Sequence, residues 1–299
     1  MQATHPQTSL YLGLVVGVVA VSLAAIFIRL ADEAPPLTIA SYRLGVGALL
    51  MMAFAGGAWV KNGGAALQGL NLGSLPLIGL SSFCLALHFW TWIVSLEHTS
   101  IASSVVLVTT NPFIVAIASR LLWGEPLYKH TMFGIGVGVV GGAVLALGDL
   151  GGEGREFFGD VMAFSGAIAI VGYVLAGRHL RRHMPATTYN VSVYTGTAAL
   201  LIAAALVTGA PFTGFSGETY LWLLLMALIP QAIGHSLLNW SLGYATATAV
   251  TISVMAEPVI ATVVAIPILK ELPPITSVAG GILILAGIYI AMRPRQSQG

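Results

Sequence analysis

Two charged residues, Arg43 and Glu257, stand inside long apolar stretches and are the first candidates for chemistry. A charge in the middle of a membrane helix costs roughly 2.5–3.5 kcal/mol on insertion, so each one needs a function or a partner. Glu257 directly precedes Pro258, which leaves the carbonyl of Val254 without its helical donor. One interpretation makes Glu257 a carrier of protons or a ligand for a substrate amine. The other pairs it with Arg43 or with a hydrogen-bond donor on a neighbouring helix.

Polar and aromatic side chains recur at helical spacing in other apolar segments. Gln231, His235 and Asn239 follow at steps of four and share one face of a helix, with Pro230 predicting a kink. The further candidates for a substrate path are His88, Trp92, Asn111, Tyr173, Tyr194 and Trp240. Any one of them is equally well explained by hydrogen bonding between helices, commonly worth about 0.6 kcal/mol. As a set they favour a cavity with aromatic walls, suited to a small zwitterion with an apolar side chain.

The composition places these segments in a membrane. Of 299 residues, 57% are hydrophobic and 8% charged, against roughly 25% charged in soluble domains, which excludes a water-soluble globule. The net charge of +1 excludes a nucleic-acid binder built on basic patches. The single cysteine, Cys84, excludes an internal disulfide and a cysteine metal cluster. We therefore expect a lipid bilayer and a small-molecule substrate as partners, and no nucleic acid.

Turn residues and charges divide the chain into ten apolar segments of about the length that a membrane helix needs. They are Ser9–Ile28, Pro36–Gly57, Gly73–Leu96, Ile101–Leu122, Thr131–Leu147, Phe158–Gly177, Thr187–Thr208, Tyr220–Ser241, Thr246–Ile268 and Thr276–Met292. The fold class predicted is an all-α membrane protein with ten transmembrane helices.

Basic residues are unevenly divided between the two sides of such a protein. If the N-terminus is cytoplasmic, three of them fall outside, Arg29, Arg155 and Lys270, whereas eight fall inside. Those eight are Lys61, Arg120, Lys129, Arg178, Arg181, Arg182, Arg293 and Arg295. Because cytoplasmic segments of membrane proteins are rich in Lys and Arg, we expect a multi-pass protein of the inner membrane with both termini in the cytoplasm.

The two halves of the chain are similar when compared at a shift of 146 residues. The matched pairs are Gly13 with Gly159, Leu96 with Leu242, Pro112 with Pro258, Ile114 with Ile260, Glu125 with Glu271, Gly134 with Gly280 and Gly141 with Gly287. We therefore predict two five-helix repeats, residues 1–150 and 151–299. An odd number of spans inverts the second copy, an arrangement typical of secondary transporters. A duplicated scaffold is the alternative, although scaffolds rarely keep polar residues at the midplane.

Several of these residues resemble the repeat of the ten-helix EamA-type transporters of the drug/metabolite transporter superfamily. The similar positions are Pro112, Trp123-Gly124-Glu125-Pro126-Leu127, Gly159-Asp160, Pro258, Lys270-Glu271-Leu272 and, like an arginine in the second helix of that family, Arg43. Val21-Ser22 departs from the Trp-Gly pair of the family's first helix. The resemblance implies export of small metabolites such as amino acids or drugs, with the aromatic amino acid exporter branch as the nearest comparison.

Glycines stand at steps of four in one predicted span, at Gly134, Gly138 and Gly142. Small residues at such steps let two membrane helices approach closely. Together with Gly280 and Gly287 of the last span, they predict either packing between the fifth and tenth spans or the face of a homodimer.

An intramembrane enzyme is the alternative from another class, with His88 and His235 on a metal and Glu257 as a base. The sequence contains no H-E-x-x-H pair, no G-x-S-x-G elbow and no P-loop, so we expect no enzyme, no metal and no cofactor. The function predicted is secondary transport by alternating access, exporting small metabolites and most of all amino acids, including aromatic and apolar ones. Efflux of cationic or hydrophobic drugs is the second expectation.

Overall fold

The computed structural model describes residues 7–62, 68–99, 101–146, 156–269 and 275–293, and all regular secondary structure in these ranges is helical. The predicted loop at 151–154, the repeat residue Glu271 and the basic residues Arg155, Lys270 and Arg295 lie outside them. The helices are α1 (Gln7–Ser22), α2 (Ala24–Leu30), α3 (Pro36–Asn62), α4 (Leu75–His98), α5 (Ile101–Val108), α6 (Asn111–Trp123), α7 (Lys129–Ala146), α8 (Glu156–Leu180), α9 (Ala186–Thr208), α10 (Gly217–Met226), η3 (Ala227–His235), α11 (Ser236–Ser241), α12 (Ala247–Val254), α13 (Glu257–Leu269) and α14 (Ile275–Ala291).

Seven of the described helices, counted with their direct continuations, are long and apolar enough to cross a membrane. They are Gln7–Leu30, Pro36–Gly57, Leu75–His98, Phe157–Leu180, Ala186–Thr208, Gly217–Ser241 and Ala247–Ile268. Shorter apolar helices run over Asn111–Trp123 and Val278–Ala291. The prediction of an all-helical, multi-pass membrane protein is therefore confirmed. The other predicted spans coincide with α5 and α6, α7, and α14, which are interrupted or shorter.

Two of the predicted spans are broken into half-helices beside a proline. The helix is interrupted at 109–110, between α5 and α6, and at 255–256, between α12 and α13. Pro112 and Pro258 are the second residues of α6 and α13. Proline has no N–H, and its ring clashes with the carbonyl four residues before it, so a helix does not run undisturbed through such a point. The half-helices α6 and α13 therefore begin partway through their spans.

A third proline, Pro230, lies inside the segment of π-helix η3, where the sequence predicted a kink. In a π-helix the hydrogen bonds reach five residues back instead of four, so each turn holds more residues than an α-turn. Side chains four residues apart no longer lie directly above one another there. This changes the direction of Gln231 relative to His235 and Asn239.

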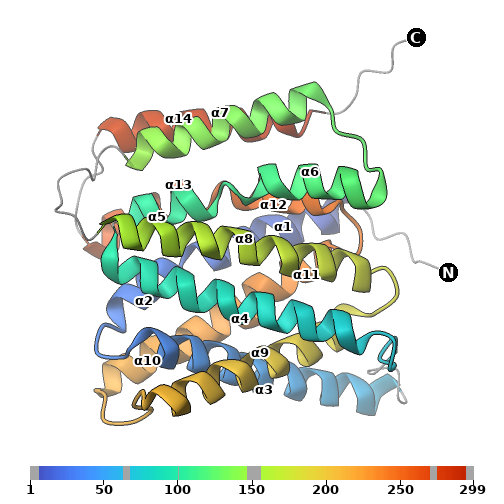
Figure 1. Ribbon diagram of the computed structural model, residues 1–299, viewed down its shortest axis with the longest axis vertical. Coiled ribbons are helices and arrows are strands. Elements are labelled where there is room, and N and C mark those ends of the chain that lie inside the picture. The colour runs from blue at the N-terminus through green and yellow to red at the C-terminus, as the bar shows by residue number, and fades with distance from the viewer. Residues whose placement is uncertain (1–6, 63–67, 100, 147–155, 270–274, 294–299) are drawn as a thin grey trace.

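The helices α7 and α14 pack side by side along one edge of the molecule, at the top of Figure 1. A Cβ atom added at Gly134 would lie 2.6 Å from the carbonyl oxygen of Gly287, and one added at Gly141 would lie 2.8 Å from that of Gly280. Only glycine permits such an approach of two backbones. The glycine stripe is thus used within one chain, and the homodimer that was its other explanation stays a prediction.

Replacing Gly134 by alanine is expected to lower the melting temperature of the purified protein in detergent. The added Cβ meets the backbone of Gly287, and overpacking of this kind costs about 1–3 kcal/mol. Gly136→Ala is the matched control in the same helix, because its Cβ would meet nothing within 4 Å. Equal melting temperatures for the two variants would contradict the close packing of α7 on α14.

Candidate substrate site

A cavity lies at the level of the two helix breaks. The residues that flank the breaks line it: Val108 and Asn111 beside the first, Val254 and Glu257 beside the second. The rest of its wall comes from α1, α2, α3, α4, α5, α8, η3, α11 and α12. Both halves of the chain therefore contribute to it. A concave, mainly apolar wall with a few convergent polar groups is typical of a small-molecule site.

Most of the site residues predicted from the sequence come together around this cavity. The lining includes Arg43, His88, Trp92, Asn111, Tyr173, His235, Asn239 and Glu257. Tyr194 and Gln231 do not line it. Both are fully buried and contact lining residues from behind, Tyr194 through Asn239 and Gln231 through Arg43.

Trp240 lies away from the cavity. It follows Asn239 directly, but consecutive residues of a helix point about 100° apart, and on the other side of Asn239 it is Leu238 that shares the cavity wall. Its ring lies 4.9 Å from the ring of Tyr244 and closely against Gly13 of α1, in a separate groove. Trp240 therefore packs between α1 and α11.

The apolar wall of the cavity is built around Phe89, which sequence reasoning did not select. The Arg43 guanidinium lies 4.1 Å from the centre of the Phe89 ring and 5.9 Å from that of Trp92. His88 stacks on Trp92 with ring centroids 6.0 Å apart, and His235 meets Phe89 edge to face at 5.4 Å. These contacts hold an aromatic surface in place on one side of the cavity. The only sequence signal for Phe89 was its position next to His88.

Arg43 is a buried cation whose hydrogen-bonding capacity is only partly used. Its Nε donates to Oε1 of Gln231 at 2.9 Å, whereas its Nη1 has no hydrogen-bond partner, and neither does Nε2 of Gln231. The side chain is 1% exposed. A buried guanidinium with an unused donor is costly unless another group completes it.

His88 has a defined tautomer. Its Nδ1 lies 3.0 Å from the carbonyl oxygen of Gly166 in α8, and a carbonyl can only accept. His88 Nδ1 therefore carries a hydrogen, and in the neutral ring Nε2 is left as an acceptor. This bond also ties α4 to α8, where the two helices pack side by side.

In the polar network around Asn239, by contrast, the side chains satisfy one another by hydrogen bonds. The Tyr173 hydroxyl donates to Oδ1 of Asn239 at 2.7 Å, and Nδ2 of Asn239 donates to Oδ1 of Asn190 at 2.8 Å and to the Tyr194 hydroxyl at 3.3 Å. Buried polar groups that satisfy one another in this way fix the positions of their helices. Here they hold α8, α9 and α11 together, so Tyr173 and Asn239 shape the wall of the cavity.

Glu257 and Asn111 are the first residues of the two half-helices, and they differ in their bonding. The Nδ2 atom of Asn111 donates to the carbonyl of Val108 at 2.8 Å, while Oδ1 of the same side chain is buried without a partner. Glu257 lines the cavity, and none of the hydrogen bonds or ion pairs between described residues involves it. Among the residues that the structure describes, Glu257 forms neither the direct ion pair with Arg43 nor the hydrogen bond to a neighbouring helix that the sequence allowed.

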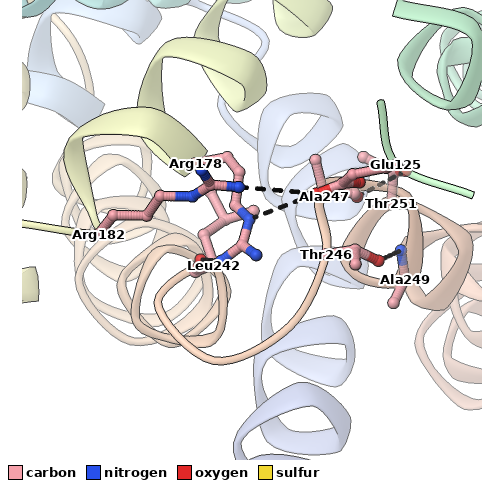
Figure 2. A network of polar contacts seen from close by, with 8 residues as sticks. All are labelled: Glu125, Arg178, Arg182, Leu242, Thr246, Ala247, Ala249 and Thr251. Carbon is pink, nitrogen blue, oxygen red and sulfur yellow. Dashed lines mark hydrogen bonds and ion pairs between the residues drawn. The ribbon is translucent and has the colours of Figure 1, made fainter. Parts of the chain in front are cut away.

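A charged cluster ties the two halves of the chain together at one end of the cavity (Figure 2). Glu125, in the segment after α6, lies 3.9 Å from Nε of Arg178, in the last turn of α8, and 4.0 Å from Nη2 of Arg182, in the turn that follows α8. Arg178 also donates through Nη1 to the carbonyl of Leu242 at 2.7 Å, and Leu242 lines the cavity. Thr246 caps the start of α12 beside this cluster by accepting from the Ala249 N–H at 3.1 Å.

Comparison with known proteins gives a consistent result over nearly the whole chain. The model of the EamA-like transporter family matches residues 8–147 and again residues 157–293. An uncharacterized transporter of Archaeoglobus fulgidus is 29% identical over 89% of this chain and 91% of its own. A probable terminal-alkyne amino-acid exporter of Streptantibioticus cattleyicolor is 26% identical over 66% of this chain and 65% of its own.

The fold has a match among solved structures as well. One crystal structure superimposes with a TM-score of 0.79 over 95% of this chain and 96% of its own, at 19% identity. At that identity the likeness concerns the fold alone. The two matches of the family model cover most of the sequence, and the relatives are transporters rather than enzymes. This chain belongs to the EamA-like transporter family.

Proposed function

We propose that the protein is a secondary transporter that exports small metabolites across the inner membrane, with amino acids that carry aromatic or other apolar side chains as its main substrates. The observation that carries the proposal is the cavity itself. It combines the aromatic surface of His88, Phe89 and Trp92 with an incompletely bonded cation, Arg43, and a free carboxylate, Glu257. The name of the Streptantibioticus relative, an amino-acid exporter, is consistent with this class of substrate.

In this proposal, the transporter has ten spans in two inverted repeats, residues 1–150 and 151–299. The helix breaks support it, because α5 and α12 begin and end 146 residues apart, and so do α6 and α13. The family model also matches each half separately. Five spans in the first repeat bring the second into the membrane from the opposite side.

Helix packing supports the same symmetry. The contact of α4 with α8 has its counterpart in the contact of α1 with η3 and α11, and the contact of α5 with α13 has its counterpart in that of α6 with α12. The pairs α7 with α14 and α3 with α9, at opposite edges of Figure 1, each join equivalent helices of the two halves. A cavity between two such halves is where alternating access places the substrate.

Alternating access requires contacts between the halves that break at one end at a time. At one end these are the contacts of Glu125 with Arg178 and Arg182. At the other end the Thr38 hydroxyl donates to the Pro211 carbonyl at 2.7 Å, and the Tyr42 hydroxyl donates to the Phe212 carbonyl, also at 2.7 Å. The arginine-rich end faces the cytoplasm if the excess of basic residues sets the orientation, which also places both termini there. Ion pairs that reach water are worth about 0–1 kcal/mol, weak enough to break in each cycle.

Removing the charge of Glu125 is expected to open the cavity toward the cytoplasm. A Thr251→Cys, Cys84→Ser protein carries one cysteine in the cavity wall, and a membrane-impermeant maleimide applied to vesicles of known orientation reports its exposure. Glu125→Gln should raise labelling from the cytoplasmic face severalfold, and Tyr42→Phe should raise it from the opposite face.

Glu218→Gln is the control for this experiment, because the Glu218 carboxylate only accepts from Trp222 within α10. It should leave labelling from both faces unchanged. If Glu125→Gln also leaves labelling unchanged, its contacts with Arg178 and Arg182 do not close the cavity.

The transport activity itself is tested by the flux of labelled phenylalanine and threonine into proteoliposomes, with and without an imposed pH gradient. We expect saturable flux that Trp92→Ala reduces by about tenfold or more, because the indole forms part of the cavity wall. Trp90→Ala is the matched control, two residues away in α4 and 44% exposed on the outer surface, and it should transport normally. Equal flux in the two variants would remove the cavity as the substrate site.

Efflux of cationic drugs is the second candidate function, favoured by the free Glu257 carboxylate beside aromatic rings. A cation would bind that carboxylate and stack on the rings. In the same proteoliposomes, transport of ethidium-type cations without transport of amino acids would establish this alternative. Transport of amino acids alone would exclude it.

A further inference from the structure

The two charges of the cavity break the symmetry of the repeat. Glu257 is the first residue of α13, and the first residue of α6 is the neutral Asn111. Arg43 is the eighth residue of α3, and the eighth residue of the equivalent helix α9 is Val193, which is fully buried. A charge that the fold required would be needed in both copies. Each charge occurs in one copy only, so we infer that they serve something that occupies the cavity asymmetrically.

The hydrogen-bond donors at the two helix breaks differ in the same way. Pro112 deprives the carbonyl of Val108 of its helical donor, and the amide nitrogen of Asn111 supplies one at 2.8 Å. Pro258 does the same to the carbonyl of Val254. There the corresponding side chain is Glu257, which as a carboxylate only accepts hydrogen bonds. The second break therefore gathers acceptors, the carboxylate of Glu257 and the carbonyl of Val254, and both residues line the cavity.

The side of the cavity near Arg43 has, by contrast, hydrogen-bond donors that lack acceptors. Nη1 of Arg43 is a buried donor without an acceptor, and Gln231, which accepts from Nε, leaves its own Nε2 without one as well. Arg43 and Glu257 attract each other electrostatically, yet no ion pair within 4.0 Å joins them. One side of the cavity thus offers donors and a positive charge, and another side offers acceptors and a negative charge.

We propose that this site binds both ends of a free α-amino acid, with the carboxylate at Arg43 and the ammonium group at Glu257. The inference rests on the proposed amino-acid transport and adds the orientation of the substrate and the two groups that recognise it. An ammonium group has three donors and no acceptor, which matches the second break, and a carboxylate is the natural partner of a guanidinium. The side chain of the substrate then lies against Phe89 and Trp92.

Competition experiments with single-charge analogues test this proposal. Exchange of labelled phenylalanine is measured in proteoliposomes against phenylalanine, its amide, its N-acetyl derivative and phenethylamine. Because a site built to hydrogen-bond a group rejects analogues that lack it, each analogue should compete about tenfold or more weakly than phenylalanine. Arg43→Gln should remove most of the discrimination against the amide, and Glu257→Gln most of that against the N-acetyl derivative.

Two further measurements keep the outcome interpretable if a variant is impaired. Arg43→Lys retains a cation and should keep part of the discrimination against the amide, and monodisperse elution in size-exclusion chromatography identifies the variants that fold. Trp90→Ala should discriminate like the wild type, since Trp90 does not line the cavity.

The same experiments distinguish an error in the proposed binding mode from an error in the proposed transport function. If phenylalanine is exchanged but all analogues compete equally, transport stands and dipolar recognition is overturned. It is also overturned if Glu257→Gln abolishes only uphill transport driven by a pH gradient and leaves exchange and discrimination intact, because Glu257 would then carry protons. If no amino acid is exchanged at all, the proposed function falls and this inference falls with it.

Discussion

A backbone carbonyl inside a membrane must find a hydrogen-bond donor, and the cavity of this protein is built where two carbonyls lose theirs. Pro112 and Pro258 stand at helix interruptions 146 residues apart, and the half-helices that follow, α6 and α13, begin with residues that line the cavity. At the first break Asn111 replaces the missing donor. At the second the side chain is Glu257, a carboxylate that accepts hydrogen bonds and cannot replace the donor. The polar character of the site follows from this constraint.

The buried polar groups form two sets, one in which the side chains satisfy one another by hydrogen bonds and one in which hydrogen-bond donors are left unused. Tyr173, Asn190, Tyr194 and Asn239 satisfy one another and fix three helices. Arg43 and Gln231 hold each other by one bond and leave Nη1 and Nε2 unused. A protein gains order from the first kind of network and is destabilised by the second unless a ligand completes it. The distinction separates the residues that shape the cavity from Arg43, which lines it with an unused donor.

The sequence predicted much of this because a helical face is periodic and a charge in a membrane is conspicuous. The all-helical fold and most polar residues of the cavity could be read from spacing and composition, and the family from the resemblance of its repeat motifs. Three details could not. Gln231 was predicted to line the cavity on the assumption of an α-helix. It lies behind the cavity wall because it belongs, with Pro230, to a π-helix. Trp240 was selected by type, whereas its side chain packs in the groove between α1 and α11. Phe89 was passed over because an apolar residue in an apolar helix carries no signal of its own.

The proposed transport requires that one chain combine movement of its two halves with selectivity for a substrate. In the proposed alternating-access mechanism, equivalent packings such as α4 with α8 and α1 with η3 let the halves exchange conformations at similar free energy. Binding requires the opposite, because two identical halves would present identical groups to a substrate whose two ends differ. In the proposed binding mode, departures from symmetry at two positions, Arg43 against Val193 and Glu257 against Asn111, orient the substrate in the cavity. A substrate with one charge of each sign adds no net charge to the membrane interior, so its passage avoids most of the cost of moving an ion.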